Sequence, residues 1–140
     1  PGQFFVNSFL LTYRRFTSAQ ELLQKMFKRF HDKRYRETEQ ARQTVQYRVL
    51  ALLRAWIEGF FEDFAENNEA LKPLVMDFLQ NQIQTPVHKV SAMNLQRVYE
   101  KSKEAFERYR RDNQRYLEEV ARRDAPPRPL SILDVNVKDI

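Results

Sequence analysis

The chain has 140 residues, of which 42% are hydrophobic, and a formal net charge of +5. This length predicts one domain with a core of its own, and the lack of cysteine excludes a disulfide framework and a thiolate zinc site. Two glycines are too few for the phosphate-binding loops of nucleotide-binding folds. No segment approaches the roughly 18 apolar residues that span a bilayer, and no signal peptide is visible. The default compartment is therefore the cytosol or the nucleus, and we predict a cytoplasmic location.

The N-terminal 30 residues contain two predicted amphipathic helices. Apolar residues recur every three or four positions over residues 5–16 and again over residues 19–30. Between them, Ser18 followed by Glu21 predicts a capping box, in which the serine hydroxyl accepts from the Glu21 N–H and the glutamate reaches back to the Ser18 N–H. The two helices should therefore meet near Phe16, with their apolar faces buried.

The middle of the chain has the strongest helical pattern. Residues 31–43 lack an apolar stripe and predict a charged loop, whereas "VQYRVLALLRAWIEGFFEDF" (45–64) is apolar around much of its circumference, as in a central helix. Gly59 indicates a close helix crossing, because glycine inside a helix costs about 1 kcal/mol relative to alanine. A further helix is predicted over residues 71–79, with Pro73 in its first turn.

The C-terminal part combines a long helix with a proline-rich segment. Pro86 is expected to end the preceding helix, and a long helix should run from near Ser91 to about Arg123. Three prolines then predict a semi-rigid spacer, and "LSILDVNVKDI" is apolar enough to indicate the start of another domain. We therefore expect a helical domain over residues 1–125, followed by a linker and the start of a further domain at 126–140.

No segment has the period of a β-strand, so the predicted fold class is all-α: an irregular multi-helix bundle with a central apolar helix and a long C-terminal helix. The residues expected in its core are large, apolar and spaced as on helix faces. They are Phe9, Leu10, Tyr13, Phe16, Leu22, Leu23, Phe30, Val49, Leu52, Leu53, Trp56, Phe60, Phe64, Phe78 and Leu79.

Reactive side chains are scarce. His31 and His88 fall in predicted loops without the convergent ligands that zinc needs or the orienting partner that a general base needs, so we expect both at the surface. Glu62, Asp63 and Glu66 could mimic paired catalytic acids, but a helix end beside solvent favours surface charge. The sequence predicts no catalytic residue, no metal site and no cofactor.

Two long segments, in order, resemble the Ras exchanger motif, the N-terminal helical domain of Ras-family guanine nucleotide exchange factors. "FVNSFLLTYRRFTSAQELLQKMFKRF" is similar to the family pattern F-L-x-T-Y-R-x-F-[TC]-x-x-x-E-L-L, and "VQYRVLALLRAWIEGFFEDF" to R-V-L-x-x-x-x-x-W-[IV]-x-x-x-F-x-D-F. "LKPLVMDFL" resembles the third helical pattern of the family. The final "LSILDVNVKDI" looks like the beginning of the catalytic exchange domain.

The resemblance implies a non-catalytic domain that packs beside the helical hairpin of a catalytic exchange domain in the same protein and keeps it active. It implies a Ras-family small GTPase as partner, and in some members a second, regulatory site for the GTP-bound form. Tyr47 and Arg48 match that site, and the Arg48 guanidinium can pair bidentately with a carboxylate. Any recruitment to membranes is then expected through other parts of the protein.

Two other classes of protein stay open on the residues alone. A free-standing helical scaffold would oligomerise through residues 92–123. A basic helical module would bind RNA or phosphoinositide surfaces through Arg108, Arg110, Arg111 and Arg115. Acidic residues between these arginines neutralise much of the charge, which favours a solvated face and no nucleic-acid partner.

Overall fold

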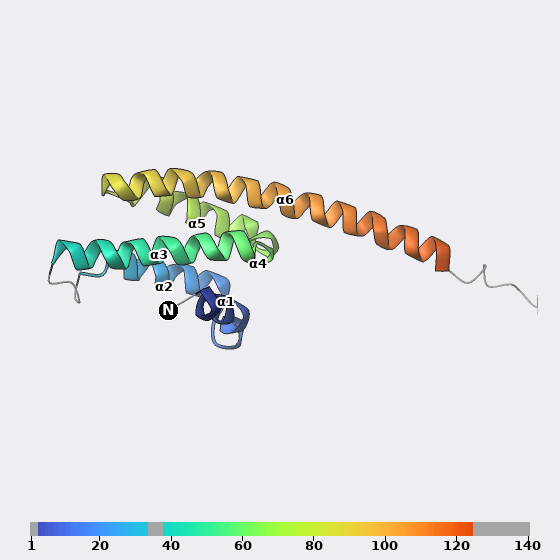
Figure 1. Cartoon of the computed structure of the whole chain (residues 1–140), viewed down its shortest axis with the longest axis horizontal. Helices are drawn as coiled ribbons and strands as arrows, with labels where there is room; N and C mark the ends of the chain where they lie inside the picture. Colours follow the sequence, from blue (N-terminus) through green and yellow to red (C-terminus); the bar gives the residue numbers. More distant parts are fainter. Residues whose placement is uncertain (1–2, 34–37, 125–140) are drawn as a thin grey trace, which may run out of the picture. The chain divides into compact units, whose positions relative to one another are not determined.

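The computed structural model describes residues 3–33 and 38–124, which form six α-helices and one 3-10 helix and contain no β-strand, so the all-α fold class is confirmed. The elements are α1 (Gln3–Thr12), η1 (Tyr13–Arg15), α2 (Ala19–His31), α3 (Glu39–Gly59), α4 (Glu62–Glu66), α5 (Asn68–Asn81) and α6 (Pro86–Asp124) (Figure 1). The chain divides into two units, residues 1–106 and 107–140. The linker and domain start expected at 126–140 lie outside the described residues.

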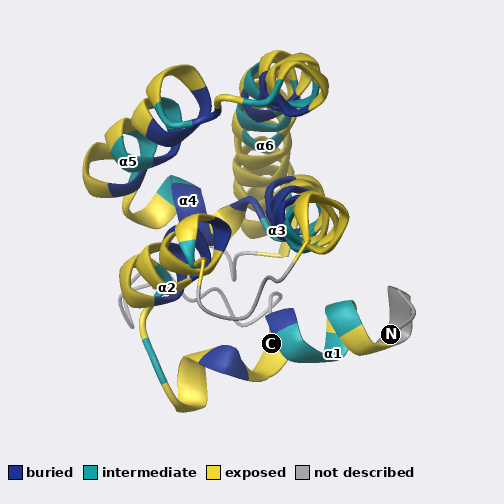
Figure 2. Cartoon of the chain, turned by 90° about the vertical axis from the view of Figure 1, so that its left-hand side faces the viewer, coloured by how far each residue is buried: buried dark blue, intermediate teal, exposed yellow. Residues whose placement is uncertain are grey.

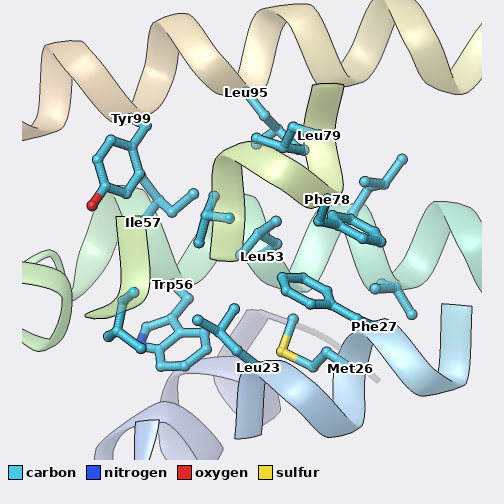
Figure 3. Close-up of a cluster of buried hydrophobic side chains, with 14 of the residues drawn as sticks. Leu23, Met26, Phe27, Leu53, Trp56, Ile57, Phe78, Leu79, Leu95 and Tyr99 are labelled. Atoms are coloured by element: carbon cyan, nitrogen blue, oxygen red, sulfur yellow. The ribbon is translucent and has the colours of Figure 1, made fainter. Parts of the chain in front are cut away.

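The first unit is built around α3. This helix packs against α1 and α2, and α2 also packs against α5. In the end-on view of Figure 2, the buried faces of α2, α3 and α5 are turned toward a shared interior. Leu53, Trp56 and Ile57 of α3 are completely buried there, between side chains of α2 on one side and of α5 and α6 on the other (Figure 3). Among the described helices, none is long and apolar enough to cross a membrane.

Aromatic rings connect these helices across the core. Phe27 of α2 stacks on Phe78 of α5 with ring centroids 4.1 Å apart. Tyr99 of α6 lies edge-on to Phe61 and Phe64, at 5.1 and 5.8 Å. Offset and edge-on pairs are favoured by the ring quadrupole, so these contacts contribute beyond the apolar area they bury. Truncation of one such ring to alanine costs about 3–5 kcal/mol.

Polar contacts fix the first part of α6 against α5. The Tyr99 hydroxyl donates to Asn68 Oδ1 at 2.8 Å, and burial raises the pKa of Tyr99 to about 12, which keeps the phenol protonated for this bond. Lys72 and Glu100 form an ion pair at 3.1 Å. Because both partners of the ion pair are partly exposed, whereas the Tyr99 side chain is completely buried, the hydrogen bond of Tyr99 is the stronger anchor.

Most residues expected in the core are inside it. The buried ones are Leu10, Tyr13, Leu22, Leu23, Phe30, Val49, Leu53, Trp56, Phe64, Phe78 and Leu79. Phe9, Leu52 and Phe60 are partly buried and pack against this cluster. The prediction that Phe16 lies in the core is wrong, because its side chain is 84% exposed. The α-helix ends at Thr12, and the three-residue turns of η1 place Phe16 outside the stripe that the α-helical period extrapolates.

The starts of α2 and α3 are capped by side chains. Ser18 Oγ accepts from the Glu21 N–H at 3.2 Å, while the Glu21 carboxylate accepts from the Thr17 hydroxyl at 2.8 Å instead of from the Ser18 N–H. At the start of α3, Thr38 Oγ1 accepts from the Ala41 N–H at 3.1 Å. The loop is therefore shorter than the predicted range of residues 31–43. The first turns of α3 are polar and carry no apolar stripe, and it is the Thr38 cap that starts the helix there.

The end of α3 also differs from the expectation. The helix ends at Gly59, because Phe60 adopts a non-helical backbone (φ −140°, ψ 44°) and the short α4 follows. The expected close crossing at Gly59 is wrong, since a Cβ atom added there would meet nothing within 4 Å. Gly59 therefore marks a helix end instead of a helix contact.

Two prolines lie at helix positions that differ from those predicted from the sequence. Pro73 is the sixth residue of α5, not part of its first turn, because α5 begins at Asn68. Its missing N–H leaves the Glu69 carbonyl without a helical partner at an exposed position that water can reach. Pro86 is the first residue of α6, so the long helix begins there and not near Ser91. Proline suits this position, where its N–H would have no partner.

His88 is buried on α6, which corrects its expected place in a surface loop. It is 3% exposed, and its ring centroid lies 6.2 Å from that of Phe30. No well-aligned hydrogen bond reaches either ring nitrogen from the described residues, although the Gln43 backbone lies near enough to act on the ring. Burial lowers the pKa of His88, an effect that the Gln43 backbone opposes. The folded state therefore favours neutral His88.

We expect His88 to make stability depend on pH. The pKa of His88 is lower in the folded state than its unfolded value of about 6.5, so the domain keeps its full stability above that pH. Stability is lost as pH falls from there toward the folded-state pKa, by at most about 1.4 kcal/mol per pH unit. His88→Phe should flatten this loss in urea unfolding measured between pH 7.5 and 5. The variant His31→Gln, at the exposed histidine, should keep it; equal profiles for His88→Phe and the parent chain would contradict the assignment.

Candidate functional site: the Asp63 cluster and the exposed faces of α1 and α3

Asp63 is a buried carboxylate with three donors. It stands in the first turn of α4 and is 4% exposed. The Tyr13 hydroxyl donates to Asp63 Oδ2 at 2.5 Å, and Trp56 Nε1–H donates to the same oxygen at 2.8 Å. The Arg14 guanidinium forms an ion pair with Oδ1. We call Tyr13, Arg14, Trp56 and Asp63 the Asp63 cluster.

The electrostatics of the Asp63 cluster favour an ionised Asp63. A carboxylate taken out of water is costly unless charged or polar donors replace its hydration. Burial raises the pKa of Tyr13, although the Arg14 side chain opposes this shift. Tyr13 therefore keeps its proton and donates a hydrogen bond to Asp63. The half-exposed Arg14 supplies the compensating positive charge from the solvent side.

The sequence interpretation of Asp63 as surface charge was wrong, whereas Glu62 and Glu66 are exposed as expected. The α3 helix ends before Phe60, and the chain starts a new helix, α4, at Glu62. The helical period of α3 therefore does not continue to Asp63, and this side chain points into the core. A signal was available: a buried tryptophan N–H needs an acceptor, and Asp63 lies seven residues after Trp56.

The Asp63 cluster joins three elements that are distant in sequence. It holds η1 against the end of α3 and the start of α4, and the Tyr13 ring also lies edge-on to the Trp56 ring at 5.5 Å. The residues around η1 that do not enter the core include large apolar side chains. Phe5, Leu11 and Phe16 are 59%, 68% and 84% exposed. The cluster thus fixes a segment that presents apolar side chains to solvent.

The outer face of α3 carries Tyr47 and Arg48, for which the sequence resemblance predicted a GTPase contact. Tyr47 is 64% exposed, and Arg48 is exposed beside it. Arg48 has no ion-pair partner within the described ranges, whereas Arg54, further along the same helix, pairs with Glu58. Arg48 is therefore available to a carboxylate from another molecule, and Arg54 is already neutralised.

The described residues bring together no group of three His, Cys, Asp or Glu side chains suited to a metal ion. His31, expected in a loop, is the last residue of α2, and its Nε2 lies 2.9 Å from Gln82 Oε1. Gln82 in turn donates to Asp77 at 2.7 Å. The hydrogen bond from Asn81, followed by this one from Gln82, lowers the pKa of Asp77. These contacts connect the ends of α2 and α5 at the surface.

The fold and the Asp63 cluster define an all-helical domain in which a buried tyrosine–tryptophan–aspartate contact holds the N-terminal segment. Residues 2–81 match the RasGEF N-terminal motif, and the chain belongs to this family. The match includes all four residues of the Asp63 cluster and ends before α6.

The chain is similar to several Ras guanine nucleotide exchange factors of Dictyostelium discoideum. The chain is 25% identical to factor A over 141 residues, which cover 97% of this chain and 22% of that protein. It is 37% identical to factor I over 67 residues (44% of this chain, 8% of that protein) and 36% identical to factor K over 75 residues (54% and 5%). The chain thus spans less than a quarter of the length of these relatives.

We expect Asp63→Asn to destabilise the domain by about 2–4 kcal/mol, because an amide nitrogen would face donors and the positive charge of Arg14 would lose its buried partner. Glu62→Gln removes the same charge from the neighbouring exposed residue and should change stability by no more than about 0.5 kcal/mol. Urea unfolding of both variants at pH 7 measures the difference. Equal stability of the two variants would show that the Asp63 cluster does not hold the fold.

Proposed function

We propose that this chain is the non-catalytic, stabilising N-terminal domain of a cytoplasmic Ras-family guanine nucleotide exchange factor, and that it braces a catalytic exchange domain of the same protein. The observation that carries the proposal is the position of Phe16. This residue belongs to the segment that matches the family, yet it is 84% exposed next to the buried Asp63 cluster.

A rigidly held, exposed aromatic side chain suits an interface. Isolated exposed apolar residues are ordinary, but aromatic anchors at protein interfaces contribute most when the free surface is already ordered. The Asp63 cluster supplies that order, because Tyr13 and Arg14 precede Phe16 by only three and two residues. Leu11 and Phe5 of α1 add exposed apolar area in the same N-terminal segment.

For the bracing role, we expect this chain alone not to accelerate GDP release from a Ras-family GTPase, and a longer polypeptide with the exchange domain to do so. In the longer polypeptide, Phe16→Asp should slow release about fivefold or more, which corresponds to about 1 kcal/mol at an interface. The release of a fluorescent GDP analogue measures the rate.

The exposure of Phe16 makes this test specific. Phe16→Asp should leave the unfolding free energy of the isolated chain within about 0.5 kcal/mol, since the side chain contacts solvent. Met93→Ala, at another exposed apolar residue but on α6, is the matched control and should leave exchange unchanged. Exchange activity in this chain alone, or normal activity of Phe16→Asp, would contradict the proposal.

We also propose that Tyr47 and Arg48 contribute to a second site for the GTP-bound GTPase. The support is the exposure of both side chains and the unpaired state of Arg48 within the described residues. A planar guanidinium can bind a carboxylate of the partner with two hydrogen bonds, which a lysine cannot reproduce.

Arg48→Ala should weaken binding of a GTP-loaded Ras-family GTPase about tenfold, because a hydrogen bond between charged groups contributes about 1.5–3 kcal/mol. Arg48→Lys should recover only part of the affinity. Arg54→Ala removes an equal charge from the same helix and should have no effect, since Arg54 pairs with Glu58. Isothermal titration calorimetry measures the affinities, and similar losses for Arg48→Ala and Arg54→Ala would overturn a specific contact.

A further inference from the structure

The net charge of the chain is concentrated before α3. Residues 1–37 contain eight basic and three acidic residues, whereas residues 38–140 contain sixteen basic and sixteen acidic residues. The first part therefore accounts for the whole net charge of +5. The arginines of α6 form no comparable surface, because residues 107–124 contain six arginines and five acidic residues. A charge asymmetry of this kind indicates an anionic partner for the N-terminal part.

Part of this positive charge lies on one exposed face of α2. Lys28 and Arg29 follow Lys25 by three and four residues, so the three side chains share one side of the helix. These residues and Lys33, two positions beyond the helix, are exposed, and we call the four of them the α2 basic face. In Figure 2, the side of α2 that is turned away from the core is exposed. The other side is fixed in the core by its buried residues, which are Leu22, Leu23, Met26, Phe27 and Phe30.

Nearby carboxylates do not neutralise the α2 basic face through ion pairs. The acidic residues close to α2 are Glu21, Asp32 and, on α5, Asp77. Glu21 and Asp77 already accept hydrogen bonds from neutral side chains at 2.7–2.9 Å. Neither Lys25 nor Lys28 forms an ion pair in the part of the chain that the structure describes. The charges of these two lysines are therefore available to another molecule.

The α2 basic face suits the anionic surface of a membrane better than a nucleic acid or an acidic protein segment. The aromatic residues of α2, Phe27 and Phe30, are buried, so this face offers no ring that can stack on a base. Three of its four members are lysines, which are hydrated point charges and lack the planar fork that binds carboxylates bidentately. Clusters of roughly four to eight lysines and arginines on an amphipathic helix are typical of binding to anionic lipids.

We propose that the α2 basic face binds peripherally to membranes that contain anionic phospholipids, and that charge attraction provides this contact. The apolar side of α2 is occupied by the core, so the helix does not insert into the bilayer. Lys25 to Arg29 cover about 6 Å along the helix, less than the Debye length of about 8 Å at physiological ionic strength, so their charges act as a group. The domain itself then contributes to membrane recruitment, in addition to any other part of the protein.

Co-sedimentation of the purified chain with lipid vesicles tests this contact. Phosphatidylcholine vesicles with about 30% phosphatidylserine should bind the chain at low salt, and vesicles of phosphatidylcholine alone should not. An increase to about 300 mM KCl should release the chain, because salt screens exposed charges. Lys25→Gln with Lys28→Gln should weaken binding about tenfold or more, since each basic residue near an anionic membrane changes the affinity about fivefold.

The control pair is Lys89→Gln with Lys101→Gln, which makes the same change in net charge at two exposed lysines of α6. It should weaken vesicle binding by no more than about twofold, because charges beyond a Debye length from the membrane are screened. Equal losses in the two pairs, or no binding of the parent chain to phosphatidylserine vesicles, would overturn the proposal. Tighter binding to a duplex RNA that depends on Lys25 and Lys28 would also overturn it and assign the face to nucleic acid. The assay contains no GTPase, so its outcome is separate from that of the proposed function.

Discussion

The burial of one negative charge constrains the first unit more than any other single feature. Asp63 is taken out of water in the first turn of a five-residue helix, and only the donors of Tyr13, Trp56 and Arg14 make this position favourable. Since these donors come from η1 and α3, the charge is satisfied only when three elements meet correctly. A buried polar contact of this kind selects one arrangement of helices among those that hydrophobic burial alone would allow.

The apolar core and the Asp63 cluster have complementary roles. Stacked and edge-on rings from α2, α5, α6 and the start of α4 add to the hydrophobic stabilisation around α3, because burial of aromatic area is favourable in many related packings. The Asp63 cluster tolerates smaller shifts of its helices than the apolar core does, since hydrogen bonds weaken steeply when their distance and angle change. The hydrogen bonds and ion pair of the Asp63 cluster therefore help to hold η1, and α1 before it, against α3.

The family match covers residues with opposite environments. Tyr13 and Trp56 are buried, whereas Phe16 and Arg48 face solvent. The buried members help to account for the fold, whereas the exposed side chains of Phe16 and Arg48 are accessible to a partner, which is why they support a proposal about partners.

The sequence by itself determined the helical class, the central position of α3, most of the core and the Ser18 cap, because helical periodicity and capping are local properties of a few consecutive residues. It also carried the resemblance to the exchanger motif. Tertiary structure decided what periodicity cannot express: the 3-10 turn that exposes Phe16, the break at Phe60 that turns Asp63 inward, and the burial of His88 against Phe30. Each depends on where the chain leaves the regular helix and on which distant residues it then meets. That information resides in the packing of several segments and in no single stretch of sequence.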